Sequence, residues 1–181
     1  MVNVAVILAE GFEEIEAVSI IDILRRGGVT AMALGLDKLE IKGAHGLSLR
    51  ADELFENVDF NKIDMIILPG GLPGADNLAN NLRLKELLIE FNKKGKKLGA
   101  ICAAPMVLGL AGVISSIYTC YPGFESKVSQ NPPKSQNVVI DMNITTSRGP
   151  ASAMEFALAC LGELTSKQNA DEVAKGLLFE K

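Results

Sequence analysis

Residues 97–105 read KLGAICAAP, and this stretch carries the clearest indication of fold class. A short apolar segment, Lys97–Ile101, runs directly into a helical pattern over Ala103–Ala111, with Cys102 at the joint and small residues around it. A sharp turn from strand to helix projects its side chain away from the sheet and needs small neighbours. The stretch therefore predicts a nucleophile elbow at the carboxyl end of a buried strand.

Short apolar runs and longer helical patterns alternate on both sides of this elbow. Because a helix between two strands returns the chain in the same direction, this order predicts a mainly parallel sheet. We predict one domain over residues 1–181, an α/β/α sandwich of three layers. The expected strands are Val2–Ala9, Val29–Leu36, Leu39–Lys42, Leu47–Ala51, Ile63–Leu68, Lys97–Ile101, Ile117–Cys120, Val138–Asp141 and Asn143–Thr146, and the expected helices are Glu13–Arg26, Leu82–Lys94, Ala103–Ala111, Ala151–Leu164 and Asp171–Leu178.

Composition excludes several classes of protein. The 181 residues are 48% hydrophobic and 22% charged, which is typical of a packed chain and not of a disordered one. A net charge of −4 argues against a nucleic-acid partner, and no apolar run approaches the ~20 residues of a membrane-spanning helix. Met1–Ala9 lacks the basic flank of a signal peptide, and the three cysteines form no CxxC pair. We expect free thiols and a cytoplasmic protein.

Three expected strand ends carry unusual residues, and in an open α/β sheet the active crevice lies beyond such ends. They are Glu10–Glu16, Pro69–Gly74 and Cys102. If the three strands are neighbours, these segments converge in space.

Cys102 is a candidate nucleophile because the amides at the start of a helix lower the pKa of a thiol and favour the thiolate. The alternative is that Cys102 is a small buried hydrophobic residue, as most free cysteines are. Cys160 lies inside a helical pattern and is expected in the core. For Cys120, a reactive thiol and a buried hydrophobic residue both remain possible interpretations.

The other two segments each allow two interpretations. Gly70, Gly71 and Gly74 form either a backbone nest for an oxyanion or an ordinary tight turn. The glutamates of the acidic stretch form either a solvated first helical turn or a site with one inward-facing carboxyl group. Glu16 shares helical spacing with Ile20, so its side chain leans inward and would have a raised pKa, although periodicity does not choose among the four glutamates. The four are Glu10, Glu13, Glu14 and Glu16.

The chain has a single histidine, His45, in a glycine-flanked hairpin. Cysteine proteases and amidotransferases normally use a histidine base beside the thiol, and no residue after Cys102 supplies one. His, Cys and carboxylate residues show no zinc-site spacing either. We therefore expect no metal and no cofactor.

Several separated motifs, in order, resemble those of the ThiJ/PfpI superfamily, a class I glutamine amidotransferase-like group, and specifically its parkinsonism-associated protein deglycase branch. They are VAVILAEGFEEIEAV at 4–18, DILRRGG at 22–28, LPGG at 68–71, GAICAAP at 99–105 and TSRGPASAMEFAL at 146–158. The resemblance spans nearly the whole chain. It implies a flavodoxin-like sandwich that forms a homodimer.

The resemblance also implies roles for particular residues. Cys102 would be the reactive nucleophile and Glu16 the protonated partner of its thiolate. Gly70 and Gly71 would donate to or shape the oxyanion site, together with the amide of Ala103. Arg26 and Arg148 match arginines that lie near the pocket or the dimer interface in relatives.

The chain departs from the family pattern near the active cysteine. Many relatives have a T-x-H-P-like segment, whereas residues 119–122 here read TCYP, with Tyr121 in place of the histidine and Cys120 beside it. This departure disfavours an amidase or protease and leaves Glu16 as the acid–base group. A second hypothesis gives Cys120 the role of resolving an oxidised Cys102 by forming a disulfide.

The function implied by the resemblance is cofactor-independent chemistry on reactive carbonyls, either glyoxalase III-like conversion of methylglyoxal to lactate or protein deglycase-like repair. The expected partners are a small aldehyde or glycated substrate and a second copy of the chain, with no nucleic acid and no membrane. The alternatives are an oxidative-stress sensor or chaperone acting through oxidation of Cys102, and a structural dimer module without chemistry.

Overall fold

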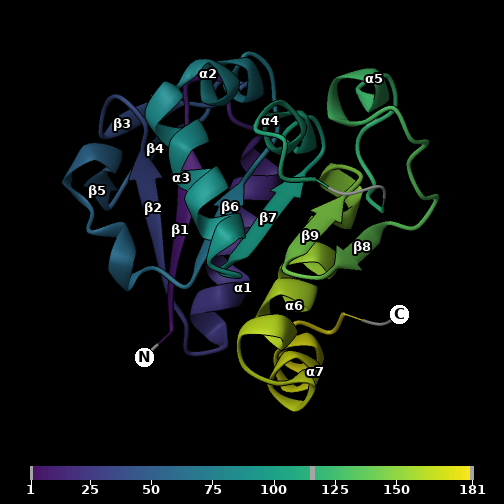
Figure 1. Ribbon diagram of the computed structural model, residues 1–181. Helices are drawn as coiled ribbons and strands as arrows, with labels where there is room; N and C mark the ends of the chain where they lie inside the picture. Colours follow the sequence, from purple (N-terminus) through teal and green to yellow (C-terminus); the bar gives the residue numbers. More distant parts are fainter. Residues whose placement is uncertain (1, 115–116, 180–181) are drawn as a thin grey trace.

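The computed structural model describes residues 2–114 and 117–179, which fold around one seven-stranded sheet (Figure 1). The strand order is β5-β2-β1-β6-β7-β9-β8, and only β8 runs antiparallel to its neighbour. A separate antiparallel hairpin pairs β3 with β4. The strands are β1 Asn3–Leu8, β2 Thr30–Gly35, β3 Glu40–Lys42, β4 Ser48–Arg50, β5 Glu53–Leu54, β6 Met65–Leu68, β7 Lys97–Ile101, β8 Val138–Asp141 and β9 Ile144–Ser147.

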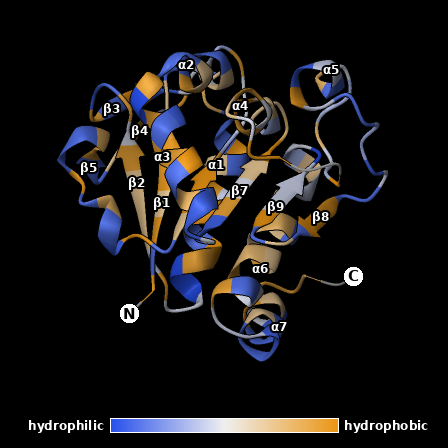
Figure 2. Cartoon of the chain, viewed as in Figure 1, coloured by the Kyte–Doolittle hydropathy of each residue, from blue (hydrophilic) through white to orange (hydrophobic). Residues whose placement is uncertain are grey.

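Helices cover both faces of the sheet, which confirms the expected three-layer α/β/α sandwich. Val4, Val6 and Leu8 of β1 pack with α1, α6 and α7, whereas Ala5 and Ile7 pack with α2, α3 and α4 on the other face. Figure 2 shows the resulting pattern, with hydrophobic strands β1 and β2 inside and amphipathic helices such as α3, which carry both hydrophilic and hydrophobic residues, outside. The helices are α1 Glu14–Arg26, α2 Gly74–Asn80, α3 Leu82–Lys93, α4 Pro105–Leu110, α5 Glu125–Val128, α6 Ala153–Leu164 and α7 Lys167–Gly176, with 3-10 turns at Phe55–Asn57, Phe60–Lys62 and Pro150–Ser152.

Some expected elements differ from those observed. The strand expected over Ile117–Cys120 is absent, because Thr119 donates its amide to the Thr146 hydroxyl and Tyr118 accepts from Lys134, so no ladder forms there. The last helix begins four residues earlier than expected, where Ser166 caps it by accepting from the Asn169 amide. Helix α2 was not expected, because its Pro-Gly start resembles a turn.

The strand order brings the three unusual strand ends together. β1, β6 and β7 are adjacent and parallel, so their carboxyl ends meet at one edge of the sheet. The convergence expected from the sequence is therefore correct. Within residues 2–114 and 117–179, no helix is both long and apolar enough to cross a bilayer.

Candidate active site

Cys102 occupies the joint between β7 and the turn that leads to α4. Its φ is 64°, in the left-handed region that side chains other than glycine rarely adopt, so the elbow is strained. The Cys102 amide donates to the Ser147 carbonyl at 2.9 Å, and its carbonyl accepts from the Tyr121 amide at 2.8 Å. These two bonds hold the strained residue from both sides. The expected sharp turn from strand to helix at Cys102 is confirmed, and the role of Cys102 as a nucleophile stays a prediction.

Gly70 makes room for this elbow. A Cβ atom on Gly70 would lie 2.7 Å from the Cys102 Cβ and 2.9 Å from the Ile101 carbonyl oxygen. No side chain fits on Gly70 at those distances, so the backbone of the loop after β6 packs directly against the elbow after β7.

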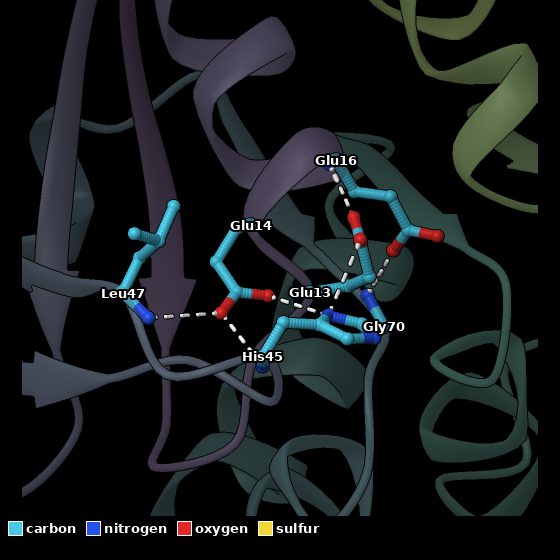
Figure 3. Close-up of polar contacts among 6 residues, drawn as sticks. All are labelled: Glu13, Glu14, Glu16, His45, Leu47 and Gly70. Carbon is cyan, nitrogen blue, oxygen red and sulfur yellow. Dashed lines mark hydrogen bonds and ion pairs between the residues drawn. The ribbon is translucent and has the colours of Figure 1, made fainter.

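Glu16 reaches the same place from the first turn of α1 and is fully buried. Its Oε2 accepts a hydrogen bond from the Gly70 amide at 2.7 Å (Figure 3). Its Oε1 has no hydrogen-bond partner among the described residues. A buried oxygen without a partner is costly, so its retention points to chemistry and not to stability.

The pKa of Glu16 is raised to about 7. Burial is the largest cause, and the charge of Glu13 adds to it, whereas the Gly70 amide and the Cys102 side chain act in the opposite direction. The Cys102 thiol therefore lies next to the Glu16 carboxyl group, although Oε1 accepts no hydrogen bond of ordinary geometry from it. An acid that titrates near neutrality can both accept and donate a proton at pH 7.

The expected lowering of the thiol pKa is wrong. Burial, followed by the charge and the hydrogen bond of the adjacent Glu16, raises the pKa of Cys102 to about 12, and the amides of Gly71 and Ala103 only partly offset these effects. α4 has just six residues and begins at Pro105, so it supplies little dipole potential at the elbow. Burial therefore disfavours ionisation of both groups, and the charge of Glu16 raises the pKa of Cys102, so the thiol and the carboxyl group titrate as one coupled pair.

The expected alternatives for the two glycines, donating to the oxyanion site or shaping it, divide between them. Gly71 and Ala103 direct their amides at the Cys102 sulfur, as the resemblance implied. The Gly70 amide is already bound by Glu16, so Gly70 contributes space and not a donor to the oxyanion site.

Tyr121 and Arg148 lie together beside the elbow. They line a surface cavity of about 340 Å³, whose other walls include Pro122 and Asn137. The Tyr121 ring also lies over Gly149, where a Cβ would be 3.1 Å from the ring. Because the Tyr121 amide donates to the Cys102 carbonyl, one wall of this cavity is bonded to the elbow.

The structure places Arg26 away from Cys102, and it places the Cys120 side chain in a different core cluster from that of Cys102. Arg26 lies at the far end of α1, ten residues or about 15 Å of helix rise beyond Glu16, and pairs with Asp22 at 2.6 Å. Cys120 is buried in the core cluster on the other face of the sheet from Cys102, and burial raises its pKa to about 11. All three cysteines are free, and Cys160 is fully buried in the core as expected.

His45 lies in the β3–β4 hairpin, where its ring meets two glutamates of the acidic stretch (Figure 3). His45 Nδ1 lies 2.9 Å from Glu14 Oε2 and 3.9 Å from Glu13 Oε1. These three residues are close enough to hold a metal ion, although the sequence showed no zinc-site spacing. Sequence spacing did not indicate it, because 31 residues separate Glu14 from His45 and only the fold joins them.

Comparison with known proteins gives the same family as the motifs. The DJ-1/PfpI family matches residues 2–163. The chain is 39% identical to the protein dj-1beta of Drosophila melanogaster over 177 residues, with 96% of this chain and 95% of that protein covered. It is 35% identical to the glutathione-independent glyoxalase DJR-1.2 of Caenorhabditis elegans, covering 95% and 93% of the two chains.

A solved structure confirms the fold. Oxidized Toxoplasma gondii DJ-1 superimposes with a TM-score of 0.95 at 35% identity and covers the whole of both chains. From sequence, fold and elbow together, this chain is a member of the DJ-1/PfpI family.

Proposed function

We propose that the chain is a cofactor-independent enzyme that uses Cys102 to convert small reactive carbonyls to hydroxy acids, such as methylglyoxal to lactate. The observation that carries the proposal is a strained cysteine beside a buried carboxyl group whose Oε1 is unpartnered. The relative from C. elegans that is named a glutathione-independent glyoxalase supports the same class of substrate. Early glycation adducts carry a related masked carbonyl and are the second substrate of this class.

The raised thiol pKa decides how the reaction begins. Because the resting thiol holds its proton, Glu16 must accept that proton while the sulfur attacks the aldehyde carbon. A carbon–sulfur bond forms, the carbonyl electron pair moves to oxygen, and Glu16 returns the proton to that oxygen. The Gly71 and Ala103 amides stabilise the negative charge during the step.

The remaining steps need no external oxidant. Glu16 takes a proton from the former aldehyde carbon, and the C–H electron pair moves toward the neighbouring carbonyl, whose oxygen is protonated to give an enediol. The neighbouring carbon then receives a proton from Glu16 while the hydroxyl group on the first carbon loses its proton and becomes the thioester carbonyl, so the first carbon is oxidised as the second is reduced. The product of this rearrangement is a thioester of the hydroxy acid on Cys102. Water hydrolyses the thioester and releases lactate and the free thiol.

Lactate formation from methylglyoxal in the absence of glutathione tests this proposal. Cys102→Ala should abolish turnover, whereas Cys160→Ala, which removes a thiol buried in the core, should retain it. In buffer containing EDTA, the wild-type rate should rise with pH through about 7, because the carboxylate form of Glu16 is the base. Unchanged lactate production by Cys102→Ala would refute the mechanism.

Oxidation of Cys102 is a second candidate function, suggested by the oxidized form of the similar T. gondii DJ-1 structure. The amides of Gly71 and Ala103 would stabilise a sulfinate at this position. The raised thiol pKa works against it, because the thiolate is the form that peroxide oxidises. Intact mass after mild peroxide would show a gain of two oxygen atoms that is absent in Cys102→Ala.

The resemblance to the family is the basis of the proposed assembly, and the free cysteines are the basis of the proposed location. The chain would form a homodimer, which light scattering after size exclusion would detect as twice the chain mass. Three free thiols suit a reducing compartment, so the cytoplasm is the proposed location.

A further inference from the structure

We propose that Glu13, Glu14 and His45 form a binding site for a divalent transition-metal cation of the zinc type. The three residues come from two elements: the start of α1 and the β3–β4 hairpin. One ligand atom of each lies within 4.8 Å of the others. The site is separate from the Cys102 thiol and does not depend on the proposed carbonyl chemistry.

The measured separations suit a small ion. Nδ1 of His45 lies 2.9 Å from Glu14 Oε2 and 3.9 Å from Glu13 Oε1. A tetrahedral zinc ion with bonds of about 2.0–2.2 Å holds its ligand atoms about 3.3–3.6 Å apart. The two measured distances lie on either side of that value, so sub-ångström side-chain shifts would bring all three atoms to bonding distance.

Each carboxylate is already oriented by the backbone (Figure 3). Glu14 Oε1 accepts the amides of His45 at 2.7 Å and Leu47 at 3.3 Å, which leaves Oε2 facing the imidazole. Glu13 Oε2 accepts the Glu16 amide at 2.7 Å, and Glu13 Oε1 faces the imidazole at 3.9 Å, beyond hydrogen-bond distance. Outer hydrogen bonds of this kind are how metal ligands are held in position.

The backbone around the cluster leaves space for these carboxylates. A Cβ on Gly43 would lie 2.4 Å from the Glu14 Cδ, so only glycine admits the carboxyl group at this point of the hairpin. Both glutamate side chains are 7% exposed, whereas that of His45 is 73% exposed. Two ligands are therefore fixed, and the third lies on the solvent side, where water can complete the coordination.

Charge and ligand type select the class of ion. Two buried carboxylates carry a charge of −2, and a protonated imidazole balances only half of it. An imidazole nitrogen with two carboxylates suits zinc, cobalt or a similar transition ion, whereas calcium and magnesium prefer oxygen ligands alone. A divalent cation would replace the proton between His45 and Glu14 and neutralise both carboxylates.

Calorimetric titration of zinc into the tag-free, EDTA-treated full chain tests the site. Wild type should bind one ion per chain, and His45→Gln and Glu13→Gln should each weaken binding at least tenfold. His45→Gln is the decisive variant because its side chain is mostly in solvent and its loss should leave the fold intact, as circular dichroism would verify. Glu10→Gln, which removes an exposed carboxylate of the same stretch, should bind as wild type does.

Cys102→Ser separates this site from the thiol. Zinc binding by Cys102→Ser should equal that of wild type, and bound cobalt should show no sulfur-to-metal charge-transfer band. Absence of stoichiometric zinc binding to wild type, equal affinity in His45→Gln, or loss of binding in Cys102→Ser would each overturn the proposal.

Discussion

Cys102 is held in a backbone conformation that is natural for glycine and unfavourable for every other residue. Its φ of 64° costs about 1–2 kcal/mol, and the flanking bonds to Ser147 and Tyr121 keep it there. The strain places the sulfur between Glu16 and the Gly71 and Ala103 amides. A relaxed backbone would direct the side chain elsewhere, so the strain serves the chemistry of the site.

Replacement of Cys102 tests this strain directly. Cys102→Gly should be more stable than Cys102→Ala by about 1 kcal/mol, because glycine adopts positive φ without steric cost. At Ala104, where φ is −65°, the matched Ala104→Gly change should instead destabilise by about 1 kcal/mol. Urea denaturation measures both differences. If glycine is less stable than alanine by the same free energy of unfolding at positions 102 and 104, the elbow stores no strain.

The position of this residue could be predicted from sequence, but its protonation state could not. A cysteine between a buried strand and small residues was enough to locate the elbow. The pKa of its thiol depends on burial and on Glu16, and Glu16 lies 86 positions earlier in the chain. Local sequence indicates only the nearby amides, and in the folded protein their effect is the smaller one.

At the scale of elements, the site is a contact between two loops that follow neighbouring strands. Gly70 after β6 lies against Cys102 after β7, and the β6 loop is also tied to α1, since Gly70 accepts from the Glu13 amide at 2.9 Å and donates to Glu16. Three elements therefore share one backbone junction. A small displacement there would separate the thiol from its base.

Gly70→Ala tests this junction. The added Cβ would lie 2.7 Å from the Cys102 Cβ, so one of the two loops must move. We expect a loss of about 1–3 kcal/mol in the free energy of unfolding and at least a tenfold loss of lactate formation. Gly162→Ala is the control. Gly162 lies within α6, and its added Cβ would meet only the Ala170 Cβ, at 3.7 Å. Because alanine favours a helix more than glycine does, this change should stabilise the protein slightly. An active, fully stable Gly70→Ala would contradict the packing argument.

Elements with strong local patterns were predictable, whereas elements defined by tertiary contacts were not. β1, β6 and β7 are short apolar runs, and the helices between them indicate that they run parallel, whereas their adjacency in the sheet comes from the structure. The segment 117–120 was also expected to be a strand, yet the Thr119 amide donates its hydrogen bond to the Thr146 hydroxyl, which no local pattern shows. The meeting of His45 with Glu14 also depends on how the β3–β4 hairpin folds back onto α1.

At the scale of the whole molecule, the buried Glu16 lowers global stability whenever it must ionise. The acid titrates near its ordinary value of 4.5 in the unfolded chain and at about 7 in the folded one. Below both values it is protonated in both states and carries no penalty. As pH rises through this window, the unfolded chain releases its proton first, so folding becomes less favourable, by about 3 kcal/mol above pH 7.

Glu16→Gln should remove this pH dependence. A glutamine oxygen still accepts from the Gly70 amide but never ionises, so the variant should gain about 3 kcal/mol relative to wild type between pH 4 and pH 8, by urea denaturation in EDTA. The other ionisable groups are common to both proteins and cancel in the difference. Glu10→Gln should show the opposite trend, because the hydrogen bond with Lys38 lowers the pKa of Glu10. Ionised Glu10 stabilises the fold above its pKa in the unfolded chain, and this stabilisation is lost as the pH falls, so the variant should lose stability relative to wild type as the pH rises. A pH-independent difference between Glu16→Gln and wild type would mean that Glu16 ionises freely in the folded protein, and it would then be too weak a base to take the Cys102 proton.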